Sequence, residues 1–380
     1  MMDGNTVFSI LDKIYRLGTK SSDTRTLDGI EPLDPKYSRF FKGGWATEEI
    51  KTRFLYLNAV LDQGSDMVGT REFLRRVTNE LYSMGIDFLH HPEKFLSNTY
   101  VVEQVVLKVH DIVKAERARW AQEFLDNPDA YNLLLVFGER VTQVLSHIVV
   151  SWGLPLAIIQ KATARYGSLL QMLDSYDTAE QMVAAIKSDR DFGLGKAIGD
   201  KACHLFCKWV VDEENLLPLV PGRAGWSKNS YEVPVDSNVG RVLVMSGIAA
   251  YFCGDDELRR QQVLQPKPDG RIYIRATNLR RCKVCKTAPL DEANSLASIR
   301  RLYASRLQTI TLPKFLNVCV ETIAAGLGEE PRIAHLDDGL LKVALTWCRN
   351  GDYRCKEGCA LKDECWAFNE APDAMAKYHT

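Results

Sequence analysis

Four of the ten cysteines lie within one short stretch of the chain. Residues 347–368 read WCRNGDYRCKEGCALKDECWAF, and the spacing of the cysteines is C-x6-C-x3-C-x5-C. The four residues are Cys348, Cys355, Cys359 and Cys365. Thiolates bind zinc and iron–sulfur clusters, and four-cysteine zinc sites usually contain C-x2-C pairs, which this run lacks. The spacing therefore favours an iron–sulfur cluster, with zinc as the alternative, over a chance group of buried thiols.

Three other stretches place polar groups where they could do chemistry. Val235–Val242 has Asp236 directly after a short apolar segment and at the start of a helical pattern, where a carboxylate can serve as an N-cap. Leu61–Asp66 is a polar break between two helical patterns, and Gly195–Ala202 is a glycine-bearing turn that opens a helix. Each of these signals is weak when it is taken alone.

Taken together, in their order along the chain, the four stretches resemble the helix-hairpin-helix DNA glycosylases of the endonuclease III type. The family's early motif L-S-x-Q-x-T-D is similar to Leu61–Asp66, and its hairpin L-P-G-V-G-x-K-[TS]-A is similar to Gly195–Ala202. Its aspartate motif V-D-T-H-[VI]-x-R-[VL] matches Val235–Val242. Its C-terminal C-x6-C-x2-C-x5-C loop matches the cysteine run with one extra residue in the middle gap.

The resemblance implies roles for individual residues. Asp236 would be the catalytic carboxylate, and Lys201 would be a nucleophile that forms a Schiff base with the sugar. Gln63 would fill the gap left by a flipped base, and the hairpin residues Gly195, Ile198 and Gly199 would bind a DNA phosphate. The four cysteines would hold a structural [4Fe-4S] cluster. The implied function is excision of a damaged or modified base, with an associated strand-cleaving lyase activity if Lys201 acts as expected.

Two further hypotheses stay open beside the glycosylase. The chain could be a non-catalytic protein that binds nucleic acid on the same scaffold, with a cluster or zinc. It could also be a zinc-binding interaction protein whose resemblance to the glycosylases is accidental.

Basic residues are concentrated in residues 259–286, within a chain whose net charge is −1. This basic segment has nine Lys and Arg residues against Asp269 alone, which gives 9 − 1 = +8. It contains Arg280 and Arg281, which we predict to contact DNA phosphates, and a lone C-x2-C pair, Cys282 and Cys285. A solvated surface hairpin is the plainer interpretation of the same charges.

The elements that must position these residues are mainly helical. Apolar residues recur at helical spacing over most of the chain, beginning at Val7, and strand-like alternation is limited to Tyr231–Val235 and Arg271–Ala276. We expect a mainly α, two-lobed fold with a small β insertion. The expected parts are an N-terminal helix and linker (1–45), a first lobe (46–242) with the hairpin near 193–211, and a second lobe (243–380). The second lobe would contain the basic segment (259–286) and the cluster loop (348–365).

Length and composition set the remaining expectations. The 380 residues are enough for two or three domains, and the near-neutral charge excludes a protein that is basic throughout. The sequence starts without the charged and apolar regions of a signal peptide, and its longest uncharged run is broken by glycine and proline. We therefore expect a cytoplasmic protein, nucleoid-associated if bacterial, that acts as a monomer on double-stranded DNA and does not enter a membrane.

Overall fold

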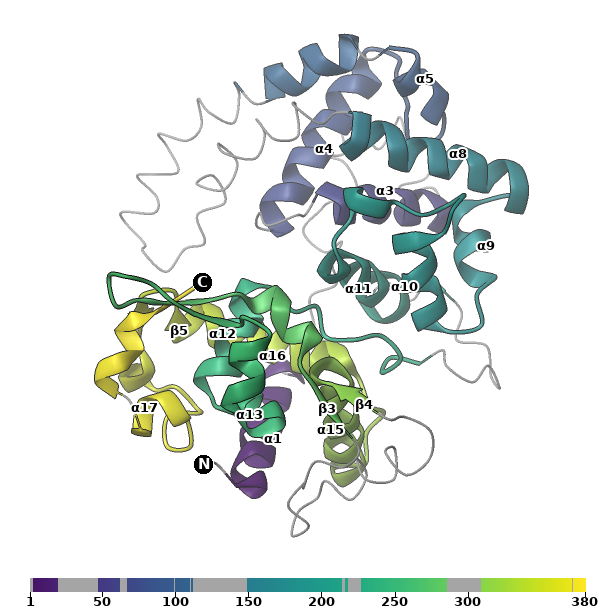
Figure 1. Cartoon of the computed structure of the whole chain (residues 1–380). Coiled ribbons are helices and arrows are strands. Elements are labelled where there is room, and N and C mark those ends of the chain that lie inside the picture. The colour runs from purple at the N-terminus through teal and green to yellow at the C-terminus, as the bar shows by residue number, and fades with distance from the viewer. Residues whose placement is uncertain are drawn as a thin grey trace. The chain divides into compact units, whose positions relative to one another are not determined.

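The computed structural model describes residues 3–19, 47–61, 67–98, 100–109, 111, 149–213, 216–217, 227–285, 309–370 and 372–380. The chain divides into two compact units, which are described separately here (Figure 1). Unit 1 comprises Met1–Arg25 and Ser227–Thr380, and unit 2 comprises Thr26–Trp226.

Helices dominate the described residues, so the predicted mainly α class is confirmed (Figure 1). The α-helices are α1 (Gly4–Thr19), α3 (Glu48–Leu61), α4 (Met67–Ser83), α5 (Pro92–Leu96), α8 (Leu154–Tyr166), α9 (Leu169–Asp174), α10 (Ala179–Ser188), α11 (Asp200–Lys208), α12 (Ser237–Met245), α13 (Ile248–Arg260), α15 (Leu312–Leu327), α16 (Ile333–Thr346) and α17 (Trp366–Glu370). The short 3-10 and π segments are η1 (Val149–Gly153), η2 (Gly195–Ala197), η3 (Trp209–Glu213), η4 (Ala276–Arg281), η5 (Cys355–Glu357) and η6 (Pro372–Lys377).

Unit 2 is built around α3, which is apolar on nearly all sides and is buried from Thr52 to Leu61. α8, α9 and α11 all pack against it. The buried Arg53 of α3 pairs with Glu49 one turn earlier, and it also donates from Nη1 to the carbonyl oxygen of Leu89 at 2.7 Å. Glu49 in turn accepts the backbone N–H groups of Leu169 and Leu170, which begin α9. Helix α3 therefore fixes the elements that lead to the α10–α11 hairpin.

Unit 1 is held together by close contact between α1 and α16. Gly18 of α1 lies against the backbone of α16, since a Cβ atom there would stand 1.7 Å from the carbonyl oxygen of His335. Gly339 of α16 lies equally close to α1, where a Cβ would stand 1.9 Å from the carbonyl oxygen of Ile14. The N-terminal helix is thus a core element of unit 1, whereas we had predicted a separate N-terminal part over residues 1–45.

The described part of unit 1 also contains three small sheets. β1 (Leu264–Pro266) and β2 (Ile272–Ile274) form an antiparallel hairpin, and β7 (Tyr378–His379) pairs with β2 in parallel. The second sheet joins β3 (Lys283–Cys285) to β4 (Thr309–Thr311), and the third joins β5 (Cys348–Arg349) to β6 (Asp352–Tyr353). The predicted hairpin at Arg271–Ala276 is confirmed.

The strand predicted at Tyr231–Val235 is wrong. This segment is extended and largely buried, but it joins no sheet in the described chain. The side chain of Asn317 in α15 donates to the carbonyl oxygens of Asn229 and Tyr231, at 2.7 and 2.8 Å, where a neighbouring strand would otherwise pair.

Most predicted helices in the described ranges are present. The apolar spacing of Glu48–Leu61 predicts a helix with the bounds of α3. The sequence also predicts two short helices within 168–188, the second starting at Asp177 or Thr178, and the side chain of Thr178 caps α10. The apolar spacing also predicts helices over Val101–Phe124 and Asn132–Ser151, and of these, residues 110, 112–124 and 132–148 lie outside the described residues. The predicted domain boundary at residue 242 falls inside α12, which packs on α16 of the same unit, so we place the boundary before Ser227.

Candidate functional site

Asp236 stands at the N-terminus of α12, where the extended segment from Tyr231 to Val235 ends. Its Oδ1 atom accepts the backbone N–H of Val239 at 2.8 Å, which is the N-cap bond expected from the sequence. The side chain is partly exposed, whereas Val235 before it and Val239 after it are buried. Buried neighbours on both sides hold the carboxylate in a fixed place with one face open to solvent, next to the positive end of the helix dipole.

Arg241 links α12 to the cysteine run. Its guanidinium is buried, and Nε donates to the carbonyl oxygen of Cys348 at 2.6 Å. The two terminal nitrogens donate to Asn238 Oδ1 at 2.9 Å and to Thr380 Oγ1 at 2.6 Å. At the end of the same helix, the carbonyl oxygen of Met245 accepts the thiol of Cys365 at 3.3 Å. One helix therefore presents Asp236 at its start and carries the cysteine run along its side.

The four cysteines of the run are all buried thiols, between 5% and 7% exposed, and none forms a disulfide. Burial, together with smaller contributions from the neighbouring Cys365 and Cys359, raises the pKa of Cys355 to about 12. Burial also raises the pKa of Cys348, where the charge of Arg241 acts in the opposite direction and the other three thiols add to the rise. All four thiols thus lie within electrostatic reach of one another.

Backbone N–H groups surround two of the four sulfur atoms of the run. Backbone N–H groups of Leu361 and Lys362 point at the sulfur of Cys359, and those of Ala367 and Phe368 point at Cys365, in each case lowering a pKa that burial raises. Hydrogen bonds of this kind stabilise thiolates and tune iron–sulfur clusters. Within the described ranges, no three His, Cys, Asp or Glu side chains are grouped so that they could hold a metal ion. The proposed ligands remain Cys348, Cys355, Cys359 and Cys365.

The two arginines predicted to contact DNA lie in different environments. The side chain of Arg280 is 16% exposed, and its Nη2 atom pairs with Glu232 Oε2 at 2.8 Å. This pair ties η4 to the segment that leads to Asp236, so Arg280 has a structural partner where we predicted a phosphate contact. Arg281, the next residue, is exposed.

The predicted hairpin in unit 2 has the expected order of helix, turn and helix, from α10 through residues 189–199 to α11. Gly195 has a left-handed φ of +55° and is exposed, and Gly199 begins α11 with no atom in the place of a Cβ. The side chain of Ile198 is buried, and its carbonyl oxygen accepts a bond from Lys187, so a phosphate could meet only its backbone N–H. Lys201 lies in the first turn of α11 and is partly exposed.

Gln63, the predicted wedge, lies outside the described residues. Lys201 belongs to unit 2, and Asp236 and the cysteine run belong to unit 1. The structure therefore brings Asp236 together with the cysteine run within unit 1, and Lys201 and the hairpin glycines are described within unit 2.

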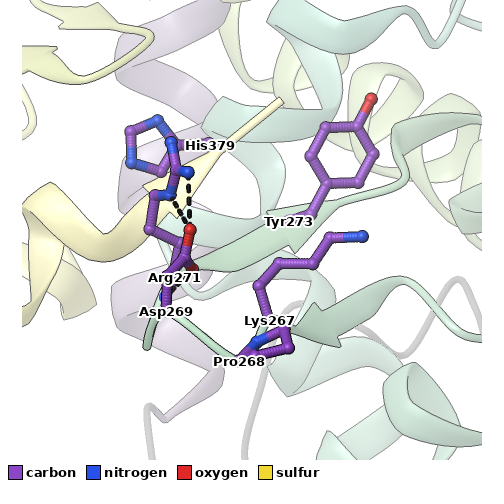
Figure 2. Close-up of a pocket in the computed structure, with 6 residues that line it drawn as sticks. All are labelled: Lys267, Pro268, Asp269, Arg271, Tyr273 and His379. Carbon is purple, nitrogen blue, oxygen red and sulfur yellow. Dashed lines mark hydrogen bonds and ion pairs between the residues drawn. The ribbon is translucent and has the colours of Figure 1, made fainter.

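A pocket that the sequence did not indicate opens on the sheet of unit 1 (Figure 2). Its volume is about 420 Å³, and its lining residues are Lys267, Pro268, Asp269, Arg271, Tyr273 and His379. His379 comes from β7, which pairs with β2 more than a hundred residues away in sequence. Local patterns give no signal for such a pairing, although the basic segment includes the other five lining residues.

Of the lone C-x2-C pair, the structure describes the side chain of Cys282. Cys282 is fully buried, and its free thiol forms a hydrogen bond with the free thiol of Cys253 in α13. This hydrogen bond and burial raise the pKa of Cys253. Cys285 lies in β3, and its side chain is outside the description. Cys203, Cys207, Cys253 and Cys319 fall within apolar helical patterns of the sequence, which predicts that they are core residues. Cys203, Cys207 and Cys319 are buried, whereas Cys253 is partly exposed.

No family model, no curated protein and no solved structure matches the chain. Within the described ranges, no helix is both long and apolar enough to cross a bilayer.

Proposed function

We propose that the chain is an iron–sulfur DNA glycosylase that flips out and excises a damaged or modified base. The observation that carries the proposal is the arrangement on α12. Two motifs that are more than a hundred residues apart in sequence, one around Asp236 and one of four cysteines, are joined by the side chain of Arg241. This is the association expected if the cysteine loop supports the element that holds a catalytic carboxylate.

The residue types suit the reaction. Cleavage of the bond between base and sugar develops positive charge on the sugar, as in glycoside hydrolysis. The Asp236 carboxylate would stabilise that charge and accept a proton from the attacking nucleophile. Its Oδ1 is held by the Val239 N–H, and within the described chain no hydrogen bond or ion pair engages Oδ2, which would face the sugar.

Lys201 would add the lyase step. After water has displaced the base, its amine would add to the aldehyde carbon of the opened sugar and lose water to form a Schiff base. The Schiff base then permits cleavage of the strand. The N-terminus of α11 and the glycines of the hairpin would bind a DNA phosphate through backbone N–H groups, because Gly199 places no side chain over them.

The cluster would be structural. A [4Fe-4S] cluster supplies rigid cross-links between thiolates when it is bound. Cys348, Cys355, Cys359 and Cys365 would hold it, and Arg241 would fix Cys348 against α12. The exposed Arg281 and the basic residues near it would add contacts to the DNA backbone.

The decisive experiment replaces Asp236 in two ways. Asparagine caps a helix about as well as aspartate, whereas alanine costs about 1 kcal/mol. We expect Asp236→Asn to keep the stability and DNA affinity of the parent and to lose at least about a thousandfold in base release on a panel of modified duplexes. Asp236→Ala should lose both base release and stability. Retention of base release by Asp236→Asn would exclude this carboxylate from catalysis.

The same panel tests Lys201. Borohydride should trap a covalent complex between the parent and the DNA, and Lys201→Gln should abolish the trapping while it keeps base release. The neighbouring exposed Lys196 provides the control, since Lys196→Gln should still be trapped.

Anaerobic purification with metal analysis separates the alternatives. Four iron atoms and four sulfides per chain would support the cluster, and a colourless zinc protein would contradict it. A cluster-bearing protein that binds duplex DNA but releases no base from any substrate would instead be the non-catalytic binding protein.

A further inference from the structure

The β2 strand presents an alternating row of basic and aromatic side chains. Residues 271, 273 and 275 are all exposed, and Ile274 between them is 2% exposed. Because side chains alternate along a strand, Arg271, Tyr273 and Arg275 share one outward face. The opposite face is anchored, since β2 packs on α12 and Val263 beside it is fully buried. The row is therefore held on a rigid support.

A second row crosses the first at Tyr273. The register of the sheet pairs Tyr273 with Gln265 of β1 on one side and with His379 of β7 on the other. Paired residues in neighbouring strands point to the same face, so the Tyr273 ring and the His379 imidazole both lie on the outer face. Figure 2 shows the resulting hollow, with Tyr273 and Lys267 on one side and Arg271 and His379 on the other.

The two basic residues that line this hollow differ in their partners. Arg271 is paired with Asp269, with Nε 2.6 Å from Oδ2, and this pair closes the turn between β1 and β2. The Lys267 ammonium lies 5.6 Å from the centroid of the Tyr273 ring, within the range of a cation–π contact. In the described part of the chain Lys267 has no carboxylate partner, and no hydrogen bond engages the side chains of Tyr273 and His379. A cation and two ring systems are thus available at one place.

We propose that this outer face binds a single-stranded nucleic acid. A base would stack on Tyr273, and the adjoining phosphates would lie against Lys267 and Arg275. Aromatic rings on a sheet flanked by basic residues are the general means of holding an unpaired strand, because each base offers a π face to the ring and each phosphate a charge to the cations. A paired base is stacked within the duplex and cannot occupy the ring.

This site goes beyond the proposed base excision, because it needs no cleavage chemistry and selects an unpaired strand. Its occupancy can be measured whether or not the protein releases bases. DNA and RNA strands share the recognised chemistry, so both belong in the test, and a mononucleotide shows whether one unit suffices.

The test measures the binding of a labelled oligothymidine strand by fluorescence anisotropy. Loss of one stacked base costs roughly 1–3 kcal/mol, so Tyr273→Ala should raise the Kd for the strand by about tenfold. The Kd of Tyr273→Phe should stay within about twofold of that of the parent. The binding constant falls as salt rises, and Lys267→Ala should make the slope of its logarithm against log salt shallower by about 0.7. This is the change expected when one phosphate contact on a single strand is lost.

Matched controls lie in unit 2. Tyr100 is 71% exposed and Lys94 is exposed in α5, so Tyr100→Ala and Lys94→Ala should leave strand affinity unchanged. Comparison of oligouridine with oligothymidine identifies the sugar that is preferred. If a mononucleotide alone displaces the labelled strand, the pocket binds a free nucleotide and the proposal is overturned. Equal affinity of Tyr273→Ala and the parent, or no binding of single strands by the parent, would also overturn it.

Discussion

Arg241 is a buried cation whose three bonds reach three different parts of unit 1. They end on the carbonyl oxygen of Cys348, the amide of Asn238 and the hydroxyl of Thr380. A guanidinium can satisfy these diverging acceptors together because its donors form a planar fork, and an ammonium cannot. Arg241 therefore attaches the cysteine run to α12, and its positive charge also lowers the pKa of Cys348.

Arg241→Lys should lower the free energy of unfolding of unit 1 by about 2 kcal/mol, because it leaves at least one buried acceptor unsatisfied. Iron content per chain should fall with it, since Cys348 loses its attachment to α12. Denaturant unfolding and iron analysis of the purified protein measure the two effects. Arg16→Lys is the matched control in the same unit, since the side chain of Arg16 is 54% exposed and pairs with Asp12 of its own helix. Unchanged iron and stability in Arg241→Lys would remove Arg241 from the support of the cluster.

At the scale of elements, the contact between α1 and α16 depends on glycines that a helix would not otherwise favour. Gly339 lies inside α16, where alanine has the higher helix propensity by about 1 kcal/mol. A Cβ at this position would nevertheless stand 1.9 Å from the backbone of Ile14, and a backbone atom cannot turn aside as a flexible side chain does. Helix propensity thus predicts that Gly339→Ala stabilises the protein, whereas packing predicts that it destabilises the protein.

We expect packing to prevail, so Gly339→Ala should destabilise unit 1 by about 2–3 kcal/mol. Gly326→Ala in α15 is the control, because that glycine is exposed and a Cβ there would meet nothing within 4 Å. It should leave stability unchanged or raise it by up to about 1 kcal/mol. Thermal unfolding followed by circular dichroism distinguishes the two, and a stabilising Gly339→Ala would mean that α1 and α16 are farther apart than described.

At the scale of the whole molecule, the proposed cluster belongs to one of two units. Unit 2 contains Cys203 and Cys207 in its core and none of the proposed ligands. Loss of the cluster should therefore weaken unit 1 and spare unit 2.

Oxidative removal of the cluster should split thermal unfolding into two transitions, with only the lower one shifted from the loaded protein. Four additional thiols should become reactive to an alkylating agent under native conditions, and mass spectrometry should assign them to Cys348, Cys355, Cys359 and Cys365. A single transition that moves as a whole would show instead that the two units unfold together. Alkylation at Cys203 or Cys207 would place the disturbance in unit 2.

The sequence predicted those parts of the fold and site that depend on neighbouring residues. The bounds of α3, the Thr178 cap and the Asp236 cap follow from local spacing and side-chain chemistry, and the cysteine run is itself a local pattern. It did not predict the features that depend on contacts with residues far away in sequence. Asn317 occupies the carbonyl oxygens of the expected strand, Glu232 neutralises Arg280, and β7 supplies His379 to the pocket. Each of these partners lies 48 or more residues away, beyond any periodic signal.

The place of α1 in the core of unit 1 has a consequence for synthesis on the ribosome. This helix emerges early, but the elements that cover its apolar face, α15 and α16, follow only after all of unit 2. Unit 2 can begin to fold as soon as it has left the ribosome, whereas α1 must keep Ile10, Leu11 and Ile14 without partners for some three hundred residues of elongation. Closing so long a loop is slow, and the exposed apolar face is a natural substrate for chaperones in the interval.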